Sequence, residues 1–181
     1  TDFRIIEAVV KLIQEKTRNI TVVESDNVAG PAEKRMSDSG LLGRLEELGV
    51  EFFNLSRDEA ETHRVAGGEI RIPRTVLDAD YFINMPKIKT CGHTLVTLSV
   101  KNLFGTLQRA RKKELHSKLD DVLPYLAKAI RNDLIVVDGI VAMEGNGPVI
   151  GTPRGLGLVV AGSNPVAVDS VCCGIMGFDP T

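Results

Sequence analysis

The residues best suited to chemistry gather in one segment, NMPKIKTCGHTLVTLSVKNLFG, which spans residues 84–105. Lys87 and Lys89 follow an apolar stretch predicted to be a strand. If they continue it, their two-residue spacing places both ammonium groups on one side. His93 comes next, just before a predicted helix whose free N–H groups also favour an anion. Together these groups predict a binding site for a small anion, either a carboxylate or a phosphate.

The predicted helix, over residues 94–107, adds a polar face of its own. Thr94, Thr97 and Lys101 are spaced three and four residues apart, which places them on one side of a helix, opposite an apolar stripe. Lys101 would then close the anion site from its far side. We expect His93 or Lys101 to handle protons, because burial and neighbouring positive charge lower the pKa of either group toward neutrality. The alternative is that the lysines are solvated surface charges and that the histidine is structural.

Three carboxylates are candidates for the same site. Leu134–Asp138, with the sequence LIVVD, is the clearest buried strand, and it ends in Asp138. Ligands of open parallel sheets gather beyond the carboxyl ends of the strands, so we expect Asp138 and the nearby Glu144 to face the ligand. Glu144 would orient a partner or bind a cation. The alternative is a glycine-shaped turn with solvated acids.

Asp169 is the third carboxylate, and it lies on a helix that is otherwise apolar nearly all round. A carboxylate in such a place should be paired or hydrogen-bonded. The favoured interpretation is a structural partner for a backbone or lysine group, and the alternative is a place in the site.

Composition limits the classes of function. A chain of 181 residues with 43% apolar and 25% charged residues is long enough for one substantial core, so we expect a single domain over residues 1–181. A net charge of −2 gives no general attraction to nucleic acid or to an anionic membrane. The basic segment that holds Arg109, Arg111, Lys112 and Lys113 has no interleaved aromatics. It therefore indicates a surface loop or an anion lid rather than a nucleic-acid site.

Neither a membrane nor an export route is indicated. No apolar run approaches the ~18 residues of a membrane span, and no signal peptide is visible, so we expect a cytoplasmic location. Cys91, Cys172 and Cys173 do not resemble a secreted disulfide framework, and three thiols cannot supply the four ligands of an ordinary iron–sulfur cluster. A metal site built on Cys91 and His93 is a less favoured alternative to free cysteines. No metal ligand is therefore predicted.

Strands that alternate with helical stripes predict an α/β fold, namely a mostly parallel, doubly wound sheet with helices on both faces. We expect a first helix capped by Asp2, a second capped by Ser37 or Asp38, a last helix capped by Asn164 and ending at Met176, and a surface segment at Arg57–Gly68 with some helical turn possible. The chain opens on a helix and stops just after one, so we expect a longer parent to supply flanking elements. The predicted strands of the sheet are Ile20–Glu24, Val50–Asn54, Tyr81–Met85, Leu134–Asp138 and Gly157–Ala161.

Three segments in order, NMPKIKTCGHTLVTLSVKNLFG, VVDGIVAMEGNGPVIGTP and AGSNPVAVDSVCCGIMGFDP, resemble the bacterial and archaeal domain-of-unknown-function family 362. The likeness covers Tyr81–Pro180. It implies an α/β protein that often carries a ferredoxin-type iron–sulfur segment after this domain, and hence redox or cofactor-linked chemistry. No such segment is present before Thr181, so a cluster would not be ligated by this chain alone. Cys91 departs from the family pattern, while the matching positions are Lys87, Lys89, His93, Lys101, Asn102, Asp138, Glu144 and Asp169.

Two functions of different class follow. The first is an enzyme-type domain that binds a small anion between the Lys87–His93 loop and the Asp138–Glu144 loop, with a redox link implied by the resemblance. The second is a non-catalytic accessory or electron-transfer module whose lysines dock an acidic iron–sulfur partner. A deep pocket that contains Lys101 would favour the enzyme, and a flat, exposed lysine patch would favour docking.

Overall fold

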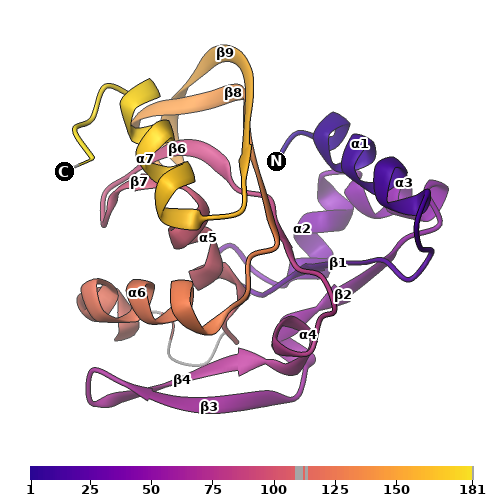
Figure 1. Cartoon of the computed structure of the whole chain (residues 1–181), viewed down its shortest axis with the longest axis horizontal. Helices are drawn as coiled ribbons and strands as arrows, with labels where there is room; N and C mark the ends of the chain where they lie inside the picture. The colour runs from indigo at the N-terminus through magenta and orange to yellow at the C-terminus, as the bar shows by residue number, and fades with distance from the viewer. Residues whose placement is uncertain (109–111, 113, 181) are drawn as a thin grey trace.

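A long β-hairpin organises the C-terminal half of the chain, in a computed structural model that describes residues 1–108, 112 and 114–180 (Figure 1). Strands β8 (Leu134–Asn146) and β9 (Ile150–Gly162) pair antiparallel along almost their whole length. Strands β5 (Ile83–Asn84) and β6 (Lys87–Cys91) pair with β8 in parallel. Strand β7 (Leu95–Thr97) turns back and pairs antiparallel with β6. These five strands form the sheet that carries the candidate site.

The other strands lie in two small sheets. Strands β1 (Thr21–Glu24) and β2 (Glu51–Asn54) pair in parallel, whereas β3 (Ala60–Val65) and β4 (Gly68–Pro73) form an antiparallel hairpin. The α/β class predicted from the sequence is therefore confirmed. The finer expectation, one doubly wound and mostly parallel sheet, does not match the strand pairing among the described residues.

Two local features explain the difference. The glycine-rich segment after Asp138 continues strand β8 instead of forming a loop, and it reaches β9 through a tight turn. Such a short connection forces the two strands to be antiparallel, because a parallel pair needs a crossover of a dozen or more residues. The segment Arg57–Gly68, expected to be surface with some helical turn, contains strand β3, of which only Val65 is buried.

The first and last helices form where the sequence predicts them. Helix α1 (Phe3–Gln14) begins at Asp2, whose carboxylate accepts from the backbone N–H of Arg4. Helix α7 (Pro165–Ile175) begins at Asn164, whose side chain accepts from two backbone N–H groups. The remaining helices are α2 (Ala32–Asp38), α3 (Leu41–Glu47), α4 (Arg74–Leu77), α5 (Ser99–Thr106) and α6 (Leu119–Ala129), with short 3-10 helices η1 (Leu55–Arg57) and η2 (Glu114–Lys118).

Two helix predictions need correction. Ser37 and Asp38 do not cap a helix but end α2, and Gly40, with a φ of 72°, separates α2 from α3. The predicted helix over residues 94–107 begins only at Ser99, because Leu95–Thr97 form strand β7. Thr94 and Thr97 therefore do not share a helical face with Lys101. β-Branched residues pack well on a pleated surface, and the antiparallel pairing with β6 uses that preference at Val96 and Thr97.

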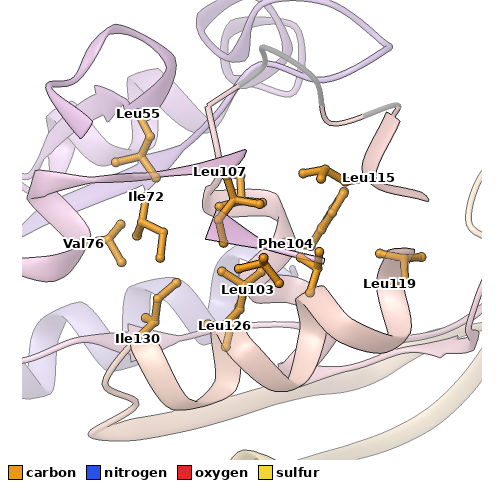
Figure 2. Close-up of a cluster of buried hydrophobic side chains, with 13 residues drawn as sticks. Leu55, Ile72, Val76, Leu103, Phe104, Leu107, Leu115, Leu119, Leu126 and Ile130 are labelled. Atoms are coloured by element: carbon orange, nitrogen blue, oxygen red, sulfur yellow. The ribbon is translucent and has the colours of Figure 1, made fainter. Parts of the chain in front are cut away.

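The largest core cluster fixes helix α5 in place. Figure 2 shows Leu103 and Phe104 of α5, and Leu107 just after it, packed among Leu119 and Leu126 of α6 and Ile72 of β4. A second cluster joins Ile88 of β6 and the inner residues of β8 to α7, and a third lies under α1 and α3. Helix α5 contacts both α6 and α7. Any side chain on α5, including Lys101, is therefore held on a rigid support.

Candidate functional site

Strand β6 presents three reactive side chains on one face. Side chains alternate along a strand, so Lys87, Lys89 and Cys91 point away from Ile88, which is buried in the second core cluster. Strand β7 adds Thr97, which lies opposite Lys89 in the antiparallel register. The predicted common side of Lys87 and Lys89 is confirmed by this arrangement.

Lys87 is already neutralised by a buried acid. Its ammonium lies 2.7 Å from Asp138 Oδ2 and donates to the carbonyl oxygen of Val141 at 2.6 Å. The Asp138 side chain is 0% exposed, and it also accepts from the backbone N–H groups of Asp2 at 2.7 Å and Ile140 at 3.0 Å. Asp138 therefore lies inside strand β8, not beyond its end, and a buried acid satisfied in this way is a structural partner of Lys87.

Lys101 stands in contrast, because its ammonium nitrogen is buried and has no hydrogen-bond partner within the part of the chain that the structure describes. The nitrogen lies 4.2 Å from the centre of the Phe104 ring, which supplies a weak cation–π contact. Burial lowers the pKa of Lys101, and burial is also the main cause that lowers the pKa of Lys89. The ammonium of Lys89 forms no hydrogen bond or salt bridge with any described residue. Both ammonium groups are thus desolvated, and Lys89 has Glu24 as a nearby acid whose charge opposes the lowering of its pKa.

Among charged groups, Cys91 has the largest electrostatic effect on the pKa of Lys89 and of Lys101. Burial alone would raise the pKa of the Cys91 thiol, but the Thr94 and Thr97 side chains and the backbone N–H groups of His93 and Thr94 hold it below its usual value. The single hydroxyl proton of Thr94 goes to the carbonyl oxygen of Val96 at 2.8 Å. A negative sulfur at Cys91 favours the charged form of both Lys89 and Lys101.

His93 joins the turn between β6 and β7 to helix α5 through a row of rings. Its imidazole stacks on His116 of η2, with centroids 4.5 Å apart and an angle of 15° between the planes. His116 in turn lies 5.4 Å from the Phe104 ring, over which the Lys101 ammonium is placed. His93 is exposed at the outer end of this row. Its predicted role in proton transfer stays a prediction.

Three other predicted site residues lie elsewhere or have their own partners. Asp169 accepts from the backbone N–H of Ser99 at 2.7 Å and of Val100 at 3.0 Å, so it caps helix α5 from α7. Burial raises the pKa of Asp169. The side-chain amide of Asn102 donates to Asn84 at 2.8 Å. Glu144 is exposed on β8, 3.7 Å from Arg154.

Lys112 makes hydrogen bonds that the sequence alone does not predict. Its ammonium donates to Ser25 Oγ at 2.5 Å and to the carbonyl oxygens of Gly105 at 3.0 Å and Asp26 at 3.2 Å. Burial lowers the pKa of Lys112 to about 8. These bonds tie the predicted basic lid to the end of β1 and the end of α5. The other lid residues, Arg109, Arg111 and Lys113, lie outside the described residues.

Among residues 1–108, 112 and 114–180, no group of three or more His, Cys, Asp or Glu side chains is arranged to hold a metal ion. None of the helices in those ranges is long and apolar enough to cross a membrane.

Comparisons with known proteins extend the resemblance to nearly the whole chain. The sequence model of the family described as a domain of unknown function (DUF362) matches residues 1–174. A thylakoid-associated protein of Synechocystis sp. is 32% identical over 183 residues, which cover 97% of this chain and 57% of that protein. The chain thus spans little more than half the length of this curated relative.

Proposed function

Because this chain belongs to the family of the domain of unknown function DUF362, whose description assigns no reaction, we propose its function from the geometry of the site. We propose that the domain binds a small anion, a carboxylate or a phosphate, between Lys89 and Lys101. The site is of the enzyme type, with Lys101 as the buried cation that receives the anion. Lys87 and Asp138 hold strand β6 against strand β8 and so support Lys89.

One observation carries this proposal, namely the buried ammonium of Lys101 that lacks a hydrogen-bond partner among the described residues. A buried ammonium without a partner is costly, and folded proteins seldom retain one without a use for it. A bound anion would supply charge-assisted hydrogen bonds at this point and offset the cost of desolvation. Lys89 is a second desolvated ammonium in the same segment of the chain, on strand β6, and the proposal has it share the anion.

The alternative function is an accessory or electron-transfer module that docks an acidic iron–sulfur partner through its lysines. Docking of that kind needs a patch of exposed ammonium groups. Lys87 is engaged by Asp138, and Lys101 is buried. These two placements support a pocket rather than a docking patch.

The redox link and the location are separate proposals. A ferredoxin-like domain or protein is the proposed redox partner, and it rests on the family resemblance alone. The cytoplasm is the proposed location, while the relative in Synechocystis is a thylakoid-associated protein. Cell fractionation with detection of this chain tests the location, and recovery in the membrane fraction would contradict it.

Calorimetric titration tests the anion site. Inorganic phosphate and small carboxylates such as acetate and malonate are titrated into the wild type, Lys101→Met and Lys128→Met. We expect Lys101→Met to weaken binding by about 1–3 kcal/mol, or about 5–150-fold, the scale of a charge-assisted hydrogen bond. Lys128 is exposed on helix α6, so its removal is the matched control and should leave binding unchanged. Binding by none of the proteins, or equal binding by wild type and Lys101→Met, would contradict the proposal.

A further inference from the structure

We propose that the chain forms a symmetric dimer through the outer edge of strand β9 and the exposed face of helix α7. The partner on this surface is a second copy of the same chain, related to the first by a two-fold axis. The contact is separate from the proposed anion site, because none of the lysines of that site belongs to β9 or α7.

Strand β9 lies at one end of the five-stranded sheet. It pairs with β8, and β5 and β6 pair with the other side of β8. Among the residues that the structure describes, no strand pairs with the second edge of β9. The backbone N–H and C=O groups on that edge can therefore form a ladder of hydrogen bonds with another strand.

The second half of this edge lacks the features that usually prevent pairing. Edge strands of natural proteins are commonly protected by charged side chains, by proline or by a covering element. The first half of β9 contains Pro153 and Arg154, whereas residues 156–162, with the sequence LGLVVAG, contain neither a charge nor a proline. Val159 is half exposed in this segment. Residues 156–162 are therefore the part of β9 best suited to pair with another strand.

Helix α7 follows β9 and presents an outer face without charge. Val166, Val171 and Ile175 are 63%, 55% and 40% exposed. The one charged residue of the helix, Asp169, accepts hydrogen bonds from the start of α5 and so points inward. Helix α1, by contrast, exposes Lys11. A helix that is apolar on nearly every side is normally covered on every side, so the outer face of α7 has the composition of a contact surface.

The helix face and the strand edge lie on the same side of the molecule. Asp169 points toward α5, and Val171, two residues later, points about 200° away from it around the helix. Helix α5 follows β7, and β7 lies at the opposite end of the sheet from β9. The side of α7 that carries Val171 is therefore the side nearest to the open edge of β9.

A second copy of the chain is complementary to this surface. An antiparallel pair of identical strands obeys a two-fold axis, so the same edge can serve both copies. The pairing would join the two sheets into one and leave both α7 helices on the same face, where their apolar side chains meet. Since residues 156–162 and the exposed face of α7 carry no charge, the contact buries no unpaired charge from either copy.

The size of the surface indicates how strong the dimer should be. A stable interface takes about 20–30 residues from each partner. Strand β9 and helix α7 contain 13 and 11 residues, and part of each element faces its own core. We therefore expect a dimer that dissociates at micromolar concentration, rather than an obligate one.

Sedimentation equilibrium of the chain, from low to high micromolar concentration, measures the dissociation constant. We expect a monomer–dimer equilibrium in the wild type. Val171→Glu should raise the dissociation constant by about tenfold or more, because each copy brings a carboxylate into the same apolar contact. Leu12→Glu is the matched control, since Leu12 is 65% exposed on helix α1, and it should leave the dissociation constant unchanged.

Hydrogen–deuterium exchange locates the contact. Peptides that cover residues 156–162 should exchange more slowly at high than at low protein concentration, because the outward N–H groups of β9 become hydrogen-bonded in the dimer. This protection should disappear in Val171→Glu and persist in Leu12→Glu. The measurement on the wild type requires no variant, so it tests the contact even if Val171→Glu does not fold.

The contrary outcomes are distinct. A wild-type chain that is monomeric at every concentration would overturn the dimer and assign this face to a partner of another kind. A dimer in which residues 156–162 exchange at the same rate at all concentrations would overturn the strand pairing. A dimer with an unchanged dissociation constant in a folded Val171→Glu variant would overturn the contact between the α7 helices.

Discussion

Lys101 reduces the stability of the protein when no anion is bound. Its ammonium is buried over the Phe104 ring without a hydrogen-bond partner among the described residues, so no hydrogen bond offsets the free-energy cost of desolvating the charge. Methionine has a similar shape and carries no charge. The same substitution that weakens anion binding should therefore stabilise the fold, which is the usual trade-off at a functional site.

The first prediction follows from this trade-off. Lys101→Met should raise the free energy of unfolding in anion-free buffer by about 1–3 kcal/mol, because a buried cation is replaced by an apolar group. Urea unfolding measures the change, with Lys128→Met as a surface control that should stay within about 0.5 kcal/mol of the wild type. A loss of stability in Lys101→Met would show that the ammonium has a stabilising partner.

The second prediction concerns the buried pair of Lys87 and Asp138. Asp138→Asn should lower the free energy of unfolding by about 2–4 kcal/mol, because Lys87, whose side chain is only 27% exposed, loses its counter-charge. Glu144→Gln on the same strand is the matched control. Its carboxylate is 53% exposed and 3.7 Å from Arg154, so the change should be within about 0.5 kcal/mol. Equal effects of the two substitutions in urea unfolding would contradict this account.

At the residue scale, the sequence predicts some parts of the site and misses others for physical reasons. The two-residue spacing of Lys87 and Lys89 is enough to predict their common side, because a strand alternates wherever it is paired. Thr97 comes opposite Lys89 only through the pairing of β7 with β6, which the local spacing of residues does not predict. The pairing of Asp138 with Lys87 depends on the register of β6 with β8, and local sequence does not determine that register.

At the scale of elements, helix α5 depends on a cap from a distant helix. Asp169 of α7 accepts hydrogen bonds from the backbone N–H groups of Ser99 and Val100, and from the Ser99 hydroxyl at 2.5 Å. This cap satisfies donors that otherwise lack partners at the start of a helix. It also sets the position from which Lys101 extends.

The third prediction tests this cap. Asp169→Ala should lower the free energy of unfolding by about 2–3 kcal/mol, because buried donors at the start of α5 lose their acceptor. Phosphate affinity should also fall, since the helix that carries Lys101 is no longer fixed. Ser170→Ala, at the next position of α7, should leave affinity unchanged. Normal phosphate affinity in Asp169→Ala, measured by calorimetry, would show that the cap does not position Lys101.

The fourth prediction concerns Lys112, which ties the basic segment to Ser25 and Gly105. Its pKa is about 8 in the folded chain and 10.5 in an ordinary lysine, so the unfolded chain binds more protons between these values. The free energy of unfolding of the wild type, relative to Lys112→Met, should therefore rise as the pH increases from about 8 to about 10.5. We expect a gain of the order of 1–3 kcal/mol over this range and little change below it. A difference that is flat from pH 7 to 10 in urea unfolding would contradict the lowered pKa.

The sequence predicts best the helices whose capping residue and apolar stripe lie within the same short segment. Helix α1 begins at Asp2 and helix α7 at Asn164, because each cap acts on the residues that immediately follow it. The boundary between β7 and α5 is missed because Thr94 and Thr97 have a spacing compatible with a helix, while pairing with β6 makes the segment a strand. Tertiary pairing outweighs local periodicity there.

At the scale of the whole molecule, the buried apolar side chains of the described residues fall into three clusters rather than onto two faces of one sheet. The α/β class follows from alternating stripes and strands, whereas the division into three sheets depends on pairings between distant segments. The β8–β9 hairpin shows this most clearly, because its glycine-rich tip has no local signal that separates a long ribbon from a ligand-binding loop.

The same scale explains why the sequence indicates a region for the proposed site but not how that region is assembled. Lys87, Lys89 and Lys101 belong to one short segment, in which strand β6, strand β7 and helix α5 follow one another directly. The partners that decide the charge of the site come from far away in the chain. Asp138 neutralises Lys87, and Lys112 donates a hydrogen bond to Ser25. The two residues of each pair are far apart in the sequence, so no local pattern predicts their contact.

The most direct test of the anion site is the titration of Lys101 itself by NMR, with lysine labelled at ¹³Cε and the signal assigned by its absence in Lys101→Met. Burial should keep the pKa of Lys101 below the ordinary value of 10.5 in anion-free buffer. Saturating phosphate should raise that pKa, because a bound anion favours the charged ammonium. A Lys101 signal whose titration is the same with and without phosphate would contradict the anion site at Lys101.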